Sequence, residues 1–247
     1  MKLKSIVNYN INSLKNSLLI YYAIFISVCV ALVLISRNSN GTVSSSGLEV
    51  SSAIFIFIVG LNSFKENFYF MKGNNVSRRD FLYGSALSII PVALFMSIID
   101  IIINRIYNLF IKCPTNYDMI YTLRRGEWYS TTDWVQINSI EILFNTFIFQ
   151  ASVYIVLFSL GLLITIIYYK CNSFMKVIVS VVPVALFILL NVIGTVYPNL
   201  IDKINSFITT IFGWNTRNSY AAILTFIVLY MILIVVSRLL TKKSIIK

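Results

Sequence analysis

Long apolar runs separated by short polar connections dominate the pattern of this chain. A helix needs roughly 20 mainly apolar residues to cross ~30 Å of hydrocarbon. Six runs reach or approach that length, and they are too long and too uniformly apolar for barrel strands. They are Leu18–Ile35, Val50–Phe64, Phe81–Ile103, Ile142–Tyr168, Val177–Tyr197 and Ala221–Val236. The pattern therefore predicts an all-α integral membrane protein with six transmembrane helices, forming a single transmembrane domain over residues 1–247.

Two further segments are amphipathic and too polar to span a membrane. In residues 1–17, Leu3, Val7, Ile11 and Leu14 recur at helical spacing among polar residues, which predicts an interfacial helix on the inner membrane surface that leads into the first span. The alternative is an ordinary basic flank. Residues 198–213 begin with a proline, end with a glycine and gather their apolar residues on one face, which predicts an outer amphipathic or re-entrant helix before the sixth span.

The segment 65–80 connects the second and third spans and is basic. Gly73 stands where a helix continuing from the second span would need a left-handed stop. Ser77 and Asp80 fit the S-x-x-D capping pattern, which predicts that a new helix begins at Arg78. We expect a helix, a tight turn and a second helix, with Arg78 and Arg79 exposed near the turn. The alternative is a solvated loop with no docking role.

The distribution of basic residues indicates the orientation. The side that holds both termini and segment 65–80 contains 13 basic and two acidic residues. This side therefore carries the whole formal net charge of +11. Lys and Arg favour cytoplasmic loops, so we expect both termini in the cytoplasm. Because these charges lie at the edges of the spans, they favour membrane topology over nucleic-acid binding. The outer loop, residues 112–140, is rich in Tyr and Trp and predicts an interfacial aromatic belt, with Tyr117 and Tyr121 among its members.

Several kinds of chemistry have no residues to support them. With no histidine, the chain lacks Ser-His and Cys-His catalysis and HExxH zinc sites. It has no GxxxxGK[ST] phosphate loop, and no cysteine spacing typical of a metal site. We therefore expect neither enzymatic activity nor a metal or cofactor of its own.

Few polar residues fall at membrane depth. Asp100 is the only carboxylate within a predicted span, and counting ~1.5 Å per residue from Phe81 places it near the outer interface. We expect it to mark that boundary rather than an ion site. Four amides are candidates for lining a pathway, with hydrogen bonding between helices as the alternative. These pathway candidates are Asn62, Asn145, Gln150 and Asn191.

This order of elements resembles the ABC-2 type permease, the membrane subunit of a bacterial ABC exporter. The resemblance covers the whole chain in architecture. The similarity in sequence is greatest in the segment GNNVSRRDF, Gly73–Phe81. With one extra Asn, this segment is similar to a glycine-x-Ser-Arg-basic-x-Phe turn of small permeases in Gram-positive bacteria. The match implies a multi-pass protein of the bacterial cell membrane.

The resemblance also implies partners and roles. Two permease chains, alike or different, would pair, and each would receive a cytoplasmic ATPase subunit that binds ATP and Mg²⁺. The connection between spans two and three would be the coupling element, and residues 207, 211 and 212 would belong to an outer gate. The implied docking residues are Lys72, Asn75, Ser77, Arg78, Arg79, Asp80 and Phe81, and the implied gate residues are Phe207, Ile211 and Phe212.

The apolar spans favour an amphipathic or hydrophobic substrate, and small systems of this family suggest an antimicrobial or toxin-like peptide ahead of a lipid or a drug. Two other functions remain open. One is the substrate-binding membrane subunit of a vitamin importer, which would bind its vitamin when purified alone. The other is a membrane immunity or assembly protein that acts by contact and needs no ATPase.

Overall fold

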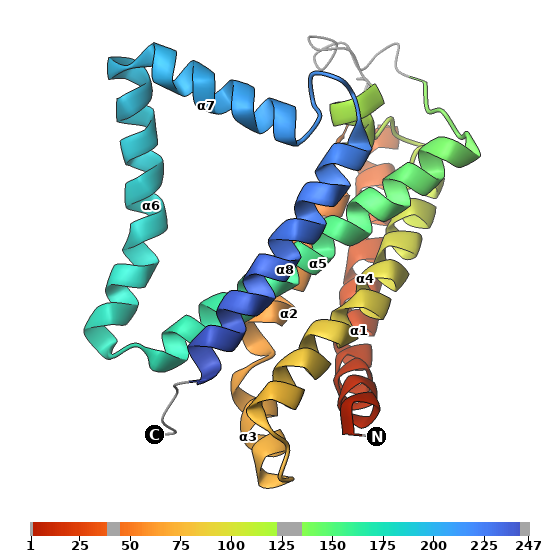
Figure 1. Ribbon diagram of the computed structural model, residues 1–247. Coiled ribbons are helices and arrows are strands. Elements are labelled where there is room, and N and C mark those ends of the chain that lie inside the picture. Colours follow the sequence, from red (N-terminus) through yellow and green to blue (C-terminus); the bar gives the residue numbers. More distant parts are fainter. Residues whose placement is uncertain (1, 39–44, 123–134, 243–247) are drawn as a thin grey trace.

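The computed structural model describes residues 2–38, 45–122 and 135–242, and this part of the chain is helical without a β-strand. Figure 1 shows the arrangement. The elements are α1 (Lys2–Asn38), α2 (Glu49–Asn62), α3 (Lys65–Gly73), α4 (Arg78–Tyr107), η1 (Asp118–Thr122), α5 (Ile140–Lys170), α6 (Ser173–Val196), α7 (Pro198–Ile211) and α8 (Ser219–Lys242). We call the end that holds α3, the start of α1 and the end of α8 the hairpin end, and the opposite end the loop end.

Five of the described helices are long and apolar enough to cross a membrane: α1, α4, α5, α6 and α8. The second predicted span corresponds to α2, which has 14 residues, ends at Asn62 and is shorter than these five helices. The chain then breaks at Ser63 and Phe64 and continues as α3 toward the hairpin end (Figure 1). The described residues therefore do not form six uninterrupted spans.

Side chains satisfy the backbone groups that the break between α2 and α3 leaves open. The Ser63 hydroxyl donates to the Gly60 carbonyl at 2.8 Å, and the Thr165 hydroxyl of α5 donates to the Leu61 carbonyl at 2.5 Å. The Asn67 amide donates to the Ser63 carbonyl at 3.2 Å. A polar backbone group without a partner is costly in an apolar surrounding, so these bonds stabilise the break.

Helix α1 contains both the amphipathic segment 1–17 and the first predicted span. It is one helix of 37 residues, without an interruption between the amphipathic segment and the first span. Its first turns pack along α4, where Ile6 lies against Gly84 and is 2% exposed. Of the apolar positions that suggested a membrane-surface helix, Leu3 is 40% exposed, whereas Ile11 and Leu14 are partly buried against the core.

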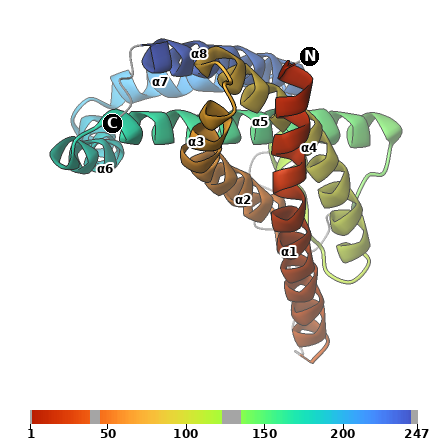
Figure 2. The same cartoon turned by 90° about the horizontal axis from the view of Figure 1, so that it is seen from below.

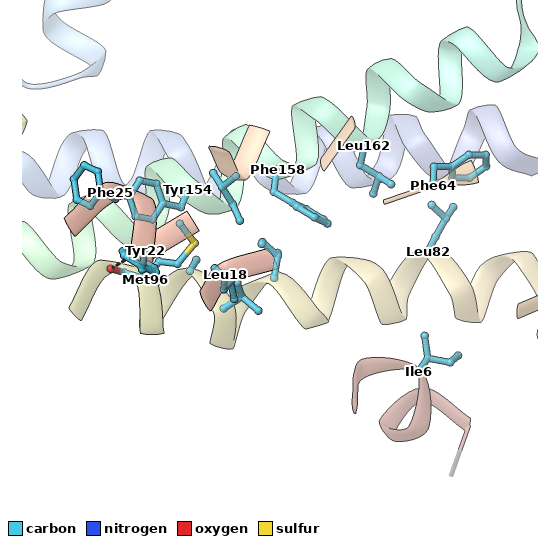
Figure 3. Close-up of a cluster of buried hydrophobic side chains, with 14 of the residues drawn as sticks. Ile6, Leu18, Tyr22, Phe25, Phe64, Leu82, Met96, Tyr154, Phe158 and Leu162 are labelled. Carbon is cyan, nitrogen blue, oxygen red and sulfur yellow. Dashed lines mark hydrogen bonds between the residues drawn. The ribbon is translucent and has the colours of Figure 1, made fainter. Parts of the chain in front are cut away.

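Helices α2 and α5 cross closely at two glycines, Gly60 and Gly161. A Cβ atom built on Gly161 would lie 2.5 Å from the Phe57 carbonyl oxygen, and one on Gly60 would collide with the Phe158 carbonyl. Small residues let the backbones of membrane helices approach closely. Above and below this crossing, a continuous core joins α1, α2, α4 and α5, and Figure 3 shows Tyr22, Met96, Tyr154, Phe158 and Leu162 within it.

Helices α6 and α7 stand apart from this core. In Figures 1 and 2, α6 runs beside the bundle at a distance from it, and α7 crosses the loop end back toward α8. No residue of α6 or α7 is buried. The predicted start of the 198–213 helix is confirmed, since Pro198 is the first residue of α7. The helix ends at Ile211, and Gly213, two residues later, takes a left-handed backbone conformation (φ 63°).

Candidate functional site

The α3–α4 hairpin has the local structure that its sequence predicts, with one correction. Ser77 caps α4, and its hydroxyl accepts a hydrogen bond from the Asp80 N–H at 3.0 Å. The left-handed residue in the turn is Asn75 (φ 55°), not Gly73, which is still helical. Asparagine tolerates this conformation better than most residues, and the Asn75 N–H donates to the Lys72 carbonyl at 3.0 Å.

An aromatic cluster anchors the hairpin to the rest of the bundle. Phe64, Phe68 and Phe81 are each at most 3% exposed. The Phe68 ring centroid lies 4.9 Å from that of Phe64 and 5.5 Å from that of Phe81, and Tyr169 of α5 packs on Phe64 at 5.5 Å. Phe81, a predicted docking residue, is therefore inaccessible to a partner, because its apolar side chain completes this core.

The polar members of the predicted docking set surround the turn. Lys72, Asn75, Ser77 and Arg79 are exposed, whereas Arg78 and Asp80 are half-buried. The Arg79 guanidinium lies 5.7 Å from the centre of the Tyr83 ring.

Arg238 of α8 belongs to the same basic surface, which sequence reasoning did not indicate. Its Nη1 donates to the Tyr83 hydroxyl at 2.7 Å, and its guanidinium lies 5.6 Å from the centre of the ring that Arg79 also contacts. The contact spans 155 positions. In the sequence, the only sign that Arg238 belongs to this surface is its positive charge near the end of the last span.

The four pathway candidates do not converge on one site. Asn62 lines a polar cavity near the hairpin end. Asn145 and Gln150 are buried in contacts between elements: the Tyr220 hydroxyl donates to Asn145 at 3.0 Å, and Gln150 donates to Glu49 at 2.9 Å. Asn191 is exposed on α6 and donates to the carbonyl one turn earlier in its own helix. For two of the four, therefore, the alternative of inter-helix hydrogen bonding applies.

The predicted gate residues differ in their exposure and contacts. Phe207 is 67% exposed on α7. Ile211 is half-buried, and Phe212 packs on Phe226 with ring centroids 5.5 Å apart. The Tyr121 hydroxyl donates to the Phe212 carbonyl at 2.9 Å. Phe212 thus ties the end of α7 to the bundle.

Asp100, predicted to mark the outer boundary, is buried between the helices of the bundle. It is 3% exposed and accepts hydrogen bonds from the hydroxyls of Tyr22 (3.1 Å), Ser52 (3.0 Å) and Tyr154 (2.6 Å). These donors come from α1, α2 and α5, so the carboxylate ties three helices to α4. Such polar groups between membrane helices act as specific connections.

Two further residues at the loop end are buried against expectation, and a second carboxylate is buried beside them. Glu49, just outside the predicted span Val50–Phe64, is the first residue of α2 and only 2% exposed. Tyr117 and Tyr121 are 6% and 4% exposed and pack on Phe149 instead of forming an interfacial belt. The other aromatic residues of this loop, Trp128, Tyr129 and Trp134, lie outside the described residues.

Within residues 2–38, 45–122 and 135–242, no group of three or more His, Cys, Asp or Glu side chains is placed to hold a metal ion. Comparisons with protein-family models, with curated proteins and with solved structures return no match for this chain. The fold and composition define a multi-pass, all-α membrane protein.

Proposed function

We propose that this chain is the permease subunit of an ATP-driven ABC exporter of the ABC-2 type, in the cell membrane of a Gram-positive bacterium. The observation that carries the proposal is the α3–α4 hairpin, which presents exposed basic residues at its turn and a fully buried aromatic face toward the bundle. A separate ATP-hydrolysing subunit would dock on this turn through a complementary acidic surface.

The hairpin is suited to transmit a push. Helix α4 continues for 30 residues from the turn to the loop end, about 45 Å at ~1.5 Å per residue. Helix α3 connects to α2 through the break at Ser63, while Phe64, Phe68 and Phe81 hold α3 against α4 and α5. A displacement of the turn would therefore move α4 directly and α2 through the break, as ATP binding and hydrolysis proceed on the partner.

The proposed topology counts α2 and α3 together as one interrupted crossing. With it, six crossings place the start of α1 and the end of α8 on one side, and in Figure 1 both lie at the hairpin end. This end carries the basic excess, so in the proposal it is cytoplasmic and α7 lies at the outer face.

A second permease chain, identical or different, would complete the pathway. Helix α6 has no buried residue and exposes large apolar side chains such as Phe187 (69% exposed), which supports a partner or lipid on this side of the molecule. The substrate proposed is an amphipathic or hydrophobic molecule, an antimicrobial or toxin-like peptide first.

The proposal is tested by co-purifying the chain with its candidate ATPase subunit. The variant Lys72→Glu/Arg79→Glu reverses two exposed charges at the turn. The control Lys170→Glu/Lys176→Glu makes the same charge change at two exposed positions beside the α5–α6 connection. We expect the ATPase to bind the wild type and the control but not the turn variant. Membrane insertion should be unchanged in all three.

If no ATPase binds the wild type, the exporter proposal fails, and a membrane protein that acts by contact alone becomes the better explanation. Equal loss of binding in both variants would point to nonspecific attraction by positive charge and would remove the hairpin from the docking site.

A further inference from the structure

A polar cavity of about 340 Å³ lies between α1, α2, α4 and α5 toward the hairpin end. Its polar lining consists of serine and asparagine side chains, and no charged residue contributes to it. Its polar residues include Asn10, Ser13, Ser17, Asn62, Ser85 and Ser88. We call it the Ser/Asn cavity. Its volume lies in the range typical of small-ligand sites.

The inner part of the Ser/Asn cavity holds a buried acceptor without a partner. Asn10 is 6% exposed, and its amide nitrogen donates to the Ser85 hydroxyl at 3.4 Å, but its Oδ1 has no hydrogen-bond partner among the described residues. Ser88 donates to the Ser85 carbonyl at 2.8 Å. Buried polar atoms in native structures are usually paired. Asn10 Oδ1 is therefore suited to accept a hydrogen bond from an N–H or O–H group of a bound molecule.

The outer part of the cavity is polar as well. Ser13 and Ser17 of α1 and Asn62 of α2 are exposed at its edge. Along α1, Asn10, Ser13 and Ser17 lie on one face and extend over about 10 Å at ~1.5 Å per residue. Polar residues inside membrane helices commonly mark a substrate path.

From these observations we infer that the Ser/Asn cavity binds uncharged backbone amides of a peptide segment. This inference rests on the proposed function and names the part of the substrate that the chain recognises. Along one edge of an extended peptide, backbone N–H groups recur at every second residue, about every 6.6 Å, so roughly two of them match the ~10 Å row of polar side chains. A lipid headgroup would concentrate its polar atoms at one point instead. The apolar lining, which includes Phe55 and Phe158, accepts the alternating apolar side chains.

The cavity is also connected to the hairpin. Ser63 and Asn67 line it, and both hydrogen-bond within the break between α2 and α3. An occupied cavity therefore contacts the residues through which the hairpin joins α2, so the peptide stabilises one arrangement of that break.

The test uses the isolated chain in nanodiscs, without an ATPase, and fluorescence polarisation of two labelled peptides. One probe is acetyl-Leu-Asn-Leu-Ser-Leu-amide, and the other replaces its polar residues with lysine. We expect saturable binding of the uncharged probe above that of empty nanodiscs. Asn10→Leu should weaken it by about tenfold, as for the loss of one hydrogen bond in a desolvated site. Asn12→Leu, the same change at an exposed position of α1 outside the cavity, should leave it unchanged.

Two further variants test the same cavity independently. Ser17→Leu blocks the exposed edge of the cavity without touching its buried part, so it should also weaken binding. It keeps the test decisive if Asn10→Leu does not fold. Asn62→Asp adds a negative charge at the edge and should shift preference toward the lysine probe.

Equal binding by the wild type and both leucine variants of the cavity would overturn the inference. Displacement of the peptide by a diglucosyl lipid added to the nanodiscs would assign the cavity to a lipid instead. Because no ATPase takes part, peptide binding can succeed while ATPase co-purification fails, or the reverse, so each proposal fails separately.

Discussion

Tyr154 of α5 and Asp100 of α4 are joined by a hydrogen bond of 2.6 Å and are 54 positions apart in sequence. Both side chains are at most 3% exposed, and Asp100 also accepts bonds from α1 and α2. One carboxylate thus connects four helices around the bundle core.

Tyr154→Phe removes the hydroxyl and leaves the ring in place. Hydrogen bonds to charged groups contribute about 1.5–3 kcal/mol, so we expect the free energy of unfolding to fall by roughly that amount. Thermal or denaturant unfolding in detergent measures it. The control is Tyr69→Phe, whose hydroxyl pairs with Tyr169 at an exposed position and should cost less than ~0.5 kcal/mol. Equal losses in both variants would contradict the role assigned to Asp100.

Gly60→Ala tests the close crossing of α2 and α5. The added methyl group would collide with the Phe158 carbonyl, which belongs to the backbone and cannot rotate away. Forcing the helices apart should cost about 1–3 kcal/mol of unfolding free energy.

The matched control for this crossing is Gly73→Ala. It is also a glycine at a helical position, but a Cβ there would meet no other atom within 4 Å. Since alanine has the better helix propensity, Gly73→Ala should be neutral or slightly stabilising. A Gly60→Ala protein as stable as the Gly73→Ala protein would show that the crossing is looser than described.

Ser77→Ala removes the cap of α4 without changing any charge of the hairpin. Losing an N-cap side chain costs about 0.5–2 kcal/mol. We expect faster amide hydrogen exchange at the start of α4 and weaker ATPase binding, because the basic residues lose their fixed positions.

The corresponding change at α5 is Ser139→Ala, since the Ser139 hydroxyl accepts from the Ile142 N–H at 3.2 Å. It should speed exchange at the start of α5 only. Faster exchange in the hairpin after Ser139→Ala would mean that the two caps do not act locally.

Cys113 provides a test of burial at the loop end. All three cysteines, at 29, 113 and 171, are free thiols. Cys113 is 0% exposed, and burial raises the pKa of its thiol to about 11. Because the thiolate is the reactive form, little of it exists at pH 8. We expect iodoacetamide to label the partly exposed Cys171 at pH 8 and to reach Cys113 only after unfolding. Equal rates in the folded protein would contradict this packing.

The hydrophobic pattern and the local signals predicted the elements whose causes are local. The long apolar helices follow from length and composition, the start of α4 from the Ser77 cap, and the start of α7 from Pro198. Each of these signals acts within a few residues, so no knowledge of the packing was needed to recognise it.

Tertiary structure alone decided which side chains face the interior. Phe81, Asp100 and Tyr121 were assigned to a docking surface, a membrane boundary and an aromatic belt, and all three are buried. The break at Ser63 depends on Thr165, which is about a hundred positions away. In a membrane the lipid is as apolar as the core, so hydrophobicity identifies a span but not its packed face. Close approach of glycines and hydrogen bonds between distant helices decide that face, and both exist only once the helices have assembled.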